Sequence, residues 1–125
     1  MNAVWIVDDD QSIRWVLERA LKQAGMSPIA FEDADSAMSA LRRGEPDVLV
    51  TDIRMPGTSG PELLDDVRMR RPKVPVIVMT AHSDLESAVA AYQGGAFEYL
   101  PKPFDIDQAV ELVRRAATQG LRSET

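Results

Sequence analysis

Short apolar runs alternate with longer segments of helical periodicity along the whole chain. The runs are rich in valine and isoleucine, and turn residues separate them from the longer segments, as is typical of strands. In the longer segments, apolar residues recur every three or four positions, which predicts amphipathic helices. We expect strands at residues 3–7, 28–31, 47–51, 75–79 and 97–100, and helices at residues 12–24, 34–43, 60–71, 84–94 and 106–117.

The predicted helices have recognisable start and stop signals. Pro61 suits the first turn of its helix, Ser83 and Glu86 form a capping pair, and Asp105 can cap the last helix. Glycines such as Gly25 and Gly44 supply stops. These signals support five separate helices.

Strict alternation of strands and helices indicates an α/β fold, with a parallel sheet covered by helices on both faces. The continuously apolar strands agree with burial on both sides. Right-handed crossovers leave few topologies, and the doubly wound order 2-1-3-4-5 is common for five strands. Ligands of such sheets bind beyond the carboxyl ends of the strands, where the order reverses between strands 1 and 3.

Composition restricts the class of protein. The chain has 125 residues, 45% hydrophobic and 27% charged, which suits one globular domain. The net charge of −6 argues against nucleic-acid binding by this segment, and the lack of cysteine excludes disulfides and thiolate metal sites. Without a membrane-length apolar run or a signal-peptide pattern, we expect a soluble, cytoplasmic protein with no membrane partner.

Acidic residues gather where the first and third predicted strands end. Asp8, Asp9 and Asp10 follow the first strand, and Asp52 follows the third. Such a cluster is costly without a cation, and oxygen ligands favour a hard ion such as Mg²⁺. The alternative is capping of the first helix. We favour capping for Asp10 and metal binding for the pair Asp8 and Asp9, because capping needs only one carboxylate.

Two further polar residues end neighbouring strands. Lys102, between two prolines, can place an ammonium near a phosphoryl oxygen, or can serve as a structural salt bridge to the acidic cluster. Thr80 can offer a hydroxyl at the same edge, or can be an ordinary threonine at a strand end. Carboxylate nucleophile, cation, ammonium and hydroxyl together suit in-line phosphoryl transfer.

Other chemistries have less support. There is no P-loop or dinucleotide fingerprint, and no serine or cysteine nucleophile has a neighbouring base. His82, the sole histidine, is interpreted as a loop residue.

The motifs IVDDD, TDIRMPG, Thr80-Ala81 and Lys102-Pro103, at these spacings, resemble those of response-regulator receiver domains of two-component signalling. The resemblance covers residues 4–117 and is most similar to the receivers of NtrC-type nitrogen regulators. It implies a three-layer (βα)5 fold of the flavodoxin/CheY-like type. One departure is Thr58-Ser59-Gly60, which lacks the acidic residue often found before that glycine.

The resemblance also implies residue roles. Asp52 would be the phosphoacceptor, and Thr80 and Lys102 would contact the phosphoryl group. Mg²⁺ would be bound by Asp9, Asp52, the backbone carbonyl of Arg54 and, through water, Asp8. Tyr99 would be an aromatic switch residue, with plain packing as the alternative, and the Lys102–Pro103 bond would be cis.

The expected partners follow from the same resemblance. A sensor histidine kinase would supply phosphate, and an ATPase domain acting with sigma-54 and a DNA-binding domain would follow in the full-length protein. We expect residues 1–118 to form the receiver and residues 119–125 to begin a frayed linker. The domain would be a signalling switch rather than an enzyme, monomeric until phosphorylation, after which it could dimerise.

Phosphorylation is expected to act through Thr80 on the helix that follows it, changing the surface made by residues 84–94, strand 97–100 and the last helix. Two rival interpretations remain. Asp8-x-Asp10-x-Ser12 nearly matches the motif of haloacid-dehalogenase-type phosphohydrolases, with Asp8 as nucleophile and Asp10 as acid/base. A receiver-shaped interaction module without phosphorylation is the other.

Overall fold

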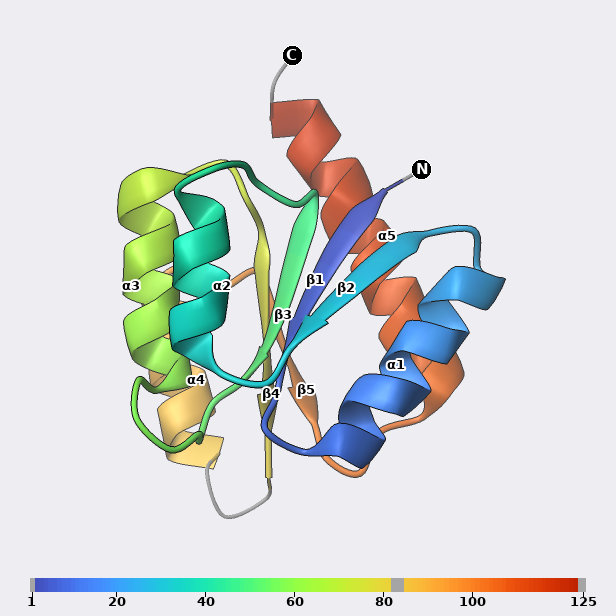
Figure 1. The fold of residues 1–125 in the computed structure, drawn as a ribbon, viewed down its shortest axis with the longest axis horizontal. Helices are drawn as coiled ribbons and strands as arrows, with labels where there is room; N and C mark the ends of the chain where they lie inside the picture. Colours follow the sequence, from blue (N-terminus) through green and yellow to red (C-terminus); the bar gives the residue numbers. More distant parts are fainter. Residues whose placement is uncertain (1, 82–84, 124–125) are drawn as a thin grey trace.

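The computed structural model describes residues 2–81 and 85–123 and has the predicted three-layer architecture. All strands pair in parallel, in the order β2-β1-β3-β4-β5. In Figure 1, α1 and α5 lie on one face of the sheet and α2, α3 and α4 on the other. The strands are β1 (Ala3–Val7), β2 (Ser27–Phe31), β3 (Val48–Asp52), β4 (Val76–Thr80) and β5 (Glu98–Pro101). The helices are α1 (Gln11–Gln23), α2 (Ala34–Leu41), α3 (Gly60–Arg70), α4 (Leu85–Gln93) and α5 (Ile106–Ser123).

The core consists of two apolar layers, one on each face of the sheet. Along β1, Trp5 and Val7 belong to the layer that includes α2 and α3 residues, while Val4 and Ile6 belong to the layer under α1 and α5. This alternation follows from the two-residue period of a strand. Every residue of β3 and β4 is buried. Packing on both faces therefore holds the ends of these two strands in place.

The register aligns the carboxyl ends of the strands. Val7 pairs with Thr51, Asp52 with Met79, and Thr80 with Pro101. The residues that follow β1 and the last residues of β3 and β4 therefore lie along one edge. This is the arrangement that strand alternation predicted.

Several predicted boundaries were wrong by a few residues. The strands β3, β4 and β5 begin and end one residue later than expected, because the ladder continues through Asp52 and Thr80. Helix α2 ends at Leu41, two residues earlier than expected. Beyond it the chain turns, and the backbone N–H groups of Arg43 and Gly44 both donate to the carbonyl of Ala40.

The last helix is longer than predicted. Instead of ending near residue 117, α5 continues to Ser123, since the polar residues beyond Ala117 include no proline to break it. The boundary between residues 118 and 119 stays a prediction. His82 and Ser83, the first residue of the predicted capping pair, lie outside the described residues. Among the described helices, none has the length and apolar character required to span a membrane.

Candidate functional site

Three carboxylates meet at the carboxyl edge of the sheet. Asp8 directly follows β1, Asp9 is next, and Asp52 ends β3, the strand paired with β1. One oxygen from each lies within 4.8 Å of the others. Asp8 is fully buried and Asp52 is 9% exposed, whereas Asp9 is exposed. This cluster of hard oxygen donors, open on one side, can bind a divalent cation.

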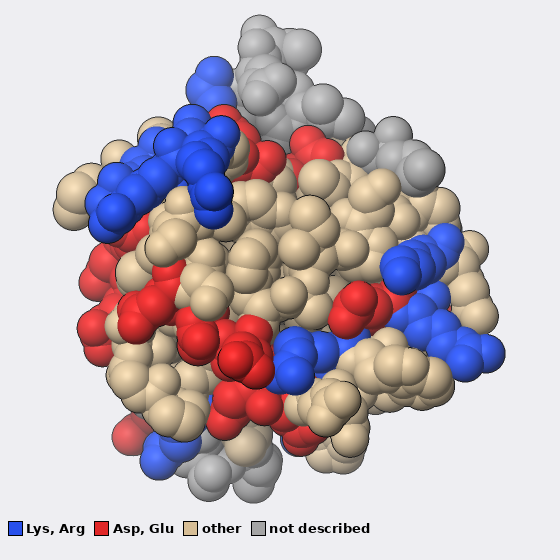
Figure 2. Space-filling view, in the orientation of Figure 1, with Lys and Arg blue, Asp and Glu red and all other residues tan. Residues whose placement is uncertain are grey.

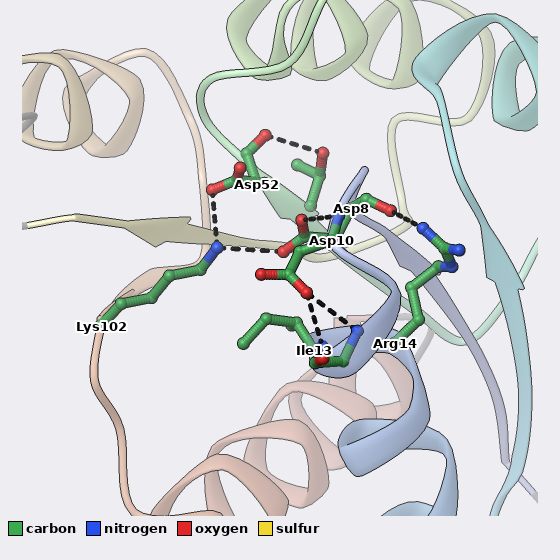
Figure 3. A network of polar contacts seen from close by, with 8 residues as sticks. Asp8, Asp10, Ile13, Arg14, Asp52 and Lys102 are labelled. Carbon is green, nitrogen blue, oxygen red and sulfur yellow. Dashed lines mark hydrogen bonds and ion pairs between the residues drawn. The ribbon is translucent and has the colours of Figure 1, made fainter.

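Lys102 contacts two of these carboxylates. Its ammonium lies 3.0 Å from Oδ2 of Asp8 and 3.3 Å from Oδ1 of Asp52, as Figure 3 shows. The lysine follows β5, and its backbone N–H donates to the carbonyl of Thr80 at 2.7 Å. The Lys102–Pro103 peptide bond is cis, as the resemblance implied. The predicted salt bridge of Lys102 to the acidic cluster is therefore confirmed. Contact of the same ammonium with a phosphoryl group on Asp52 stays a prediction.

The pKa values of Asp52 and Lys102 depend on each other and on the neighbouring Asp8. Burial raises the pKa of Asp52, the charge of Asp8 raises it further, and Lys102 lowers it in part. For Lys102, burial alone would lower the pKa, but the hydrogen bond and charge of Asp8, with Asp52, raise it overall. The ammonium therefore remains charged at neutral pH, while the carboxylates carry uncompensated repulsion that a bound cation would relieve.

Asp10 has a different role from its two neighbours. It is the N-cap of α1, and its side chain accepts hydrogen bonds from the backbone of Ser12 at 2.8 Å and Ile13 at 3.3 Å. Asp10 does not belong to the group of oxygens within 4.8 Å. Of the two alternatives for this residue, capping is confirmed.

Thr80 and Tyr99 lie on neighbouring strands. Thr80 ends β4, is buried, and donates its hydroxyl to the carbonyl of Ala81 at 3.0 Å. Tyr99 pairs with Val78 on β4 and packs, partly buried, against the core layer of α2 and α3. The contact of Thr80 with a phosphoryl group and the switch role of Tyr99 remain predictions. So does the metal role of the Arg54 carbonyl, in the loop that follows β3.

Sequence reasoning did not foresee how closely Gly60 approaches the site. Its N–H donates to the carbonyl of Ile53 at 3.1 Å, and a Cβ at this position would lie 2.7 Å from Cα of Ile53 and closer still to the carbonyl oxygen of Asp52. In the sequence, Gly60 is only the first residue of the predicted helix 60–71, and helical periodicity does not reveal this close approach. The preceding Ser59, in the turn that lacks the expected acidic residue, forms a capping box with Glu62 and so begins α3.

Charge is distributed unevenly over the surface. In Figure 2, acidic side chains extend along the lower left of the face, towards the edge at which the strands end. Lys and Arg side chains gather at the upper left, over the C-terminal ends of α2 and α3, which include Arg42, Arg68 and Arg70. Cations at helix C-termini favour the helix dipole. On the face shown, acidic side chains thus gather towards the site edge, which favours cation binding there.

Sequence comparisons identify relatives of this chain. A family model described as the response regulator receiver domain matches residues 4–114. The DNA-binding transcriptional regulator NtrC of Salmonella typhimurium is 62% identical over 113 residues, covering 90% of this chain and 24% of that protein. The C4-dicarboxylate transport transcriptional regulatory protein DctD of Pseudomonas aeruginosa is 41% identical, with the same 90% and 24% coverage.

Solved structures of related proteins also resemble this chain. The apo receiver domain of nitrogen regulatory protein C superposes with a TM-score of 0.87 at 59% identity, covering 94% of this chain and 95% of that one. NtrX from Brucella abortus superposes with a TM-score of 0.93 at 30% identity, covering 98% of this chain and 28% of that one. The chain therefore spans about a quarter of the length of these curated relatives, 24% in each.

Proposed function

Because the chain belongs to the response regulator receiver domain family and is a receiver domain of the NtrC type, we propose that Asp52 accepts a phosphoryl group and thereby switches a signalling surface. The observation that most supports this is that the ammonium of Lys102 contacts both Asp8 and Asp52, two members of the three-carboxylate cluster. A cation held on the open side and an ammonium on the other would flank a phosphoryl group on Asp52.

The chemistry is in-line transfer from a phosphohistidine. A carboxylate oxygen of Asp52 attacks phosphorus, an O–P bond forms, the N–P bond breaks, and its electron pair stays on the imidazole nitrogen. Lys102 holds the carboxylate of Asp52 and offers positive charge to the phosphoryl oxygens. Asp9, Asp52, the Arg54 carbonyl and, through water, Asp8 would hold Mg²⁺, which supplies charge neutralisation when bound.

The partner proposals extend beyond this domain. A sensor histidine kinase would donate the phosphate, and phosphorylation would alter the surface of α4, β5 and α5 through Thr80. The output would be an ATPase and a DNA-binding domain that activate sigma-54-dependent, nitrogen-regulated transcription in the cytoplasm. The domain would promote transfer of phosphate to its own Asp52 and its slow hydrolysis. It would therefore act as a signalling switch and would not turn over an external substrate.

The hydrolase alternative requires Asp8 as nucleophile and Asp10 as acid/base. Asp8 accepts hydrogen bonds at both carboxylate oxygens, from the backbone of Asp10 and from Lys102. The carboxylate of Asp10 is used in capping α1. The full burial of Asp8, against 9% exposure for Asp52, and the use of Asp10 as a helix cap lead us to favour Asp52.

Labelling by acetyl phosphate tests the proposal. We expect Mg²⁺-dependent addition of one phosphoryl group to the native protein, located on Asp52 by mass spectrometry, and none in Asp52→Asn. Phosphate on Asp8 would favour the hydrolase. Absence of label in the native protein, with Mg²⁺ bound, would favour the interaction module.

A further inference from the structure

Arg14 folds back from the first turn of α1 to the end of β1. Its guanidinium donates to the main-chain carbonyl of Asp8 at 2.7 Å, and Figure 3 shows this contact beside the acidic cluster. A cation in the first turn of a helix opposes the helix dipole. The position therefore has an electrostatic cost, which the neighbouring aspartates offset.

Asp8 is held at four points. Its N–H donates to the carbonyl of Phe31 at 3.1 Å, and its two carboxylate oxygens accept from the N–H of Asp10 at 2.9 Å and from Lys102 at 3.0 Å. The fourth contact is the carbonyl with Arg14. The β1–β3 pairing ends at Val7 with Thr51, so this carbonyl lies beyond the paired register.

We infer that Arg14 is a positioning residue for the divalent-cation site. By fixing the carbonyl of Asp8, it sets the peptide plane between Asp8 and Asp9, and so the direction in which both carboxylates leave the backbone. This inference rests on the proposed Mg²⁺ site. The simpler role for Arg14 is to satisfy a buried carbonyl, which would affect stability alone.

The two roles differ in a measurable way. A positioning role changes the Mg²⁺ affinity of the folded protein, whereas a purely structural role changes only the free energy of unfolding. Arg14→Met keeps the length of the stem and removes the donor, and Arg14→Gln is too short to reach the carbonyl. The matched control is Arg19→Met on the same helix, because Arg19 stacks on the ring of Trp15 at 5.3 Å.

The experiment titrates the native protein and these variants with Mg²⁺ alone, followed by amide chemical shifts, with urea unfolding measured in metal-free buffer. Lost outer-shell contacts typically cost tenfold or more in metal affinity, so we expect Kd to rise about tenfold in Arg14→Met and Arg14→Gln. Arg19→Met should leave the Kd close to the native value, because Arg19 stacks on Trp15 and is not bonded to Asp8. If Arg14→Met fails to fold, Arg14→Gln decides the question.

An unchanged Mg²⁺ affinity in the folded Arg14 variants, with reduced unfolding free energy, would overturn the inference. Asp9→Asn separates this failure from failure of the site itself. If Asp9→Asn binds Mg²⁺ weakly while the Arg14 variants bind normally, only the role of Arg14 is wrong. If Asp9→Asn binds as tightly as the native protein, both the Mg²⁺ site and the inference fail.

Discussion

Lys102 and Asp8 are 94 positions apart in the sequence, yet the ammonium of one lies 3.0 Å from the carboxylate of the other. Their strands are not neighbours, because β3 and β4 lie between β1 and β5. The lysine therefore reaches across the edge of the sheet and meets Asp52 on the way. Three carboxylates and one ammonium leave two formal negative charges at the site, which one divalent cation would balance.

We predict that Lys102→Met destabilises the metal-free protein. The side chain of Asp8 has no exposed surface, so removing its ammonium partner leaves a buried charge without compensation. The free energy of unfolding, measured in urea, should fall by about 3 kcal/mol. Mg²⁺ should recover part of that loss, because the cation would neutralise the same carboxylates.

The control is Lys73→Met, at an exposed lysine that follows α3. Its unfolding free energy should change by less than about 0.5 kcal/mol, with or without Mg²⁺. A loss in Lys102→Met that Mg²⁺ leaves unchanged would contradict the charge argument.

Residues at strand ends were predictable from the sequence, and residues held by local backbone geometry were not. Once alternation implied a parallel sheet, Asp8, Asp52 and Lys102 had to share an edge, and the structure confirms that they do. Gly60 and Arg14 depend instead on how a loop and a side chain fold back on the backbone. Hydrophobic periodicity carries no information about such contacts.

Thr80 provides a test of the path from Asp52 to α4. Its hydroxyl is the group we expect to move towards the phosphate, and α4 begins a short way further along the chain, at Leu85. Thr80→Val keeps the shape and removes the hydroxyl, at a cost of about 1 kcal/mol in stability. We expect Asp52 to be labelled still, while the change in amide exchange over α4, β5 and α5 is lost.

Thr80→Ser is the matched variant, because it keeps the hydroxyl. It should retain the phosphorylation-dependent exchange change in at least part of that surface. Equal responses in the valine and serine variants would remove Thr80 from the path.

Asp33 should give α2 an acid-sensitive cap. Its side chain accepts a hydrogen bond from the N–H of Ser36 at 2.7 Å, and that bond lowers the pKa of the Asp33 carboxyl. Since the folded-state pKa is depressed, the stabilisation is complete above the ordinary pKa of about 3.9 and is lost as the pH falls through the lower folded value. Asp33→Ala should lose about 1 kcal/mol at neutral pH.

Asp33→Asn separates charge from capping, because asparagine caps helices without titrating. Its stability should be close to native at pH 7, and the difference between the two proteins should change on acidification. Urea unfolding at several pH values measures this difference. A pH-independent difference would show that the charge of Asp33 contributes nothing to the cap.

Gly60→Ala should damage both the fold and the site, because the added Cβ would meet backbone atoms that cannot rotate away. Those atoms are the carbonyl oxygen of Asp52 and Cα of Ile53, the latter at 2.7 Å. Overpacking of this kind costs about 3 kcal/mol, the upper end of the usual range, since relief requires movement of the chain itself. That movement would displace Asp52, so labelling by acetyl phosphate should slow as stability falls.

Gly44→Ala is the matched control for Gly60→Ala, because nothing lies within 4 Å of its Cβ and its φ is not positive. It should be neutral or stabilising by about 0.5 kcal/mol, with labelling unchanged. Native labelling rates in a folded Gly60→Ala would mean that the loop can shift without moving Asp52, and the close approach would then matter for packing alone.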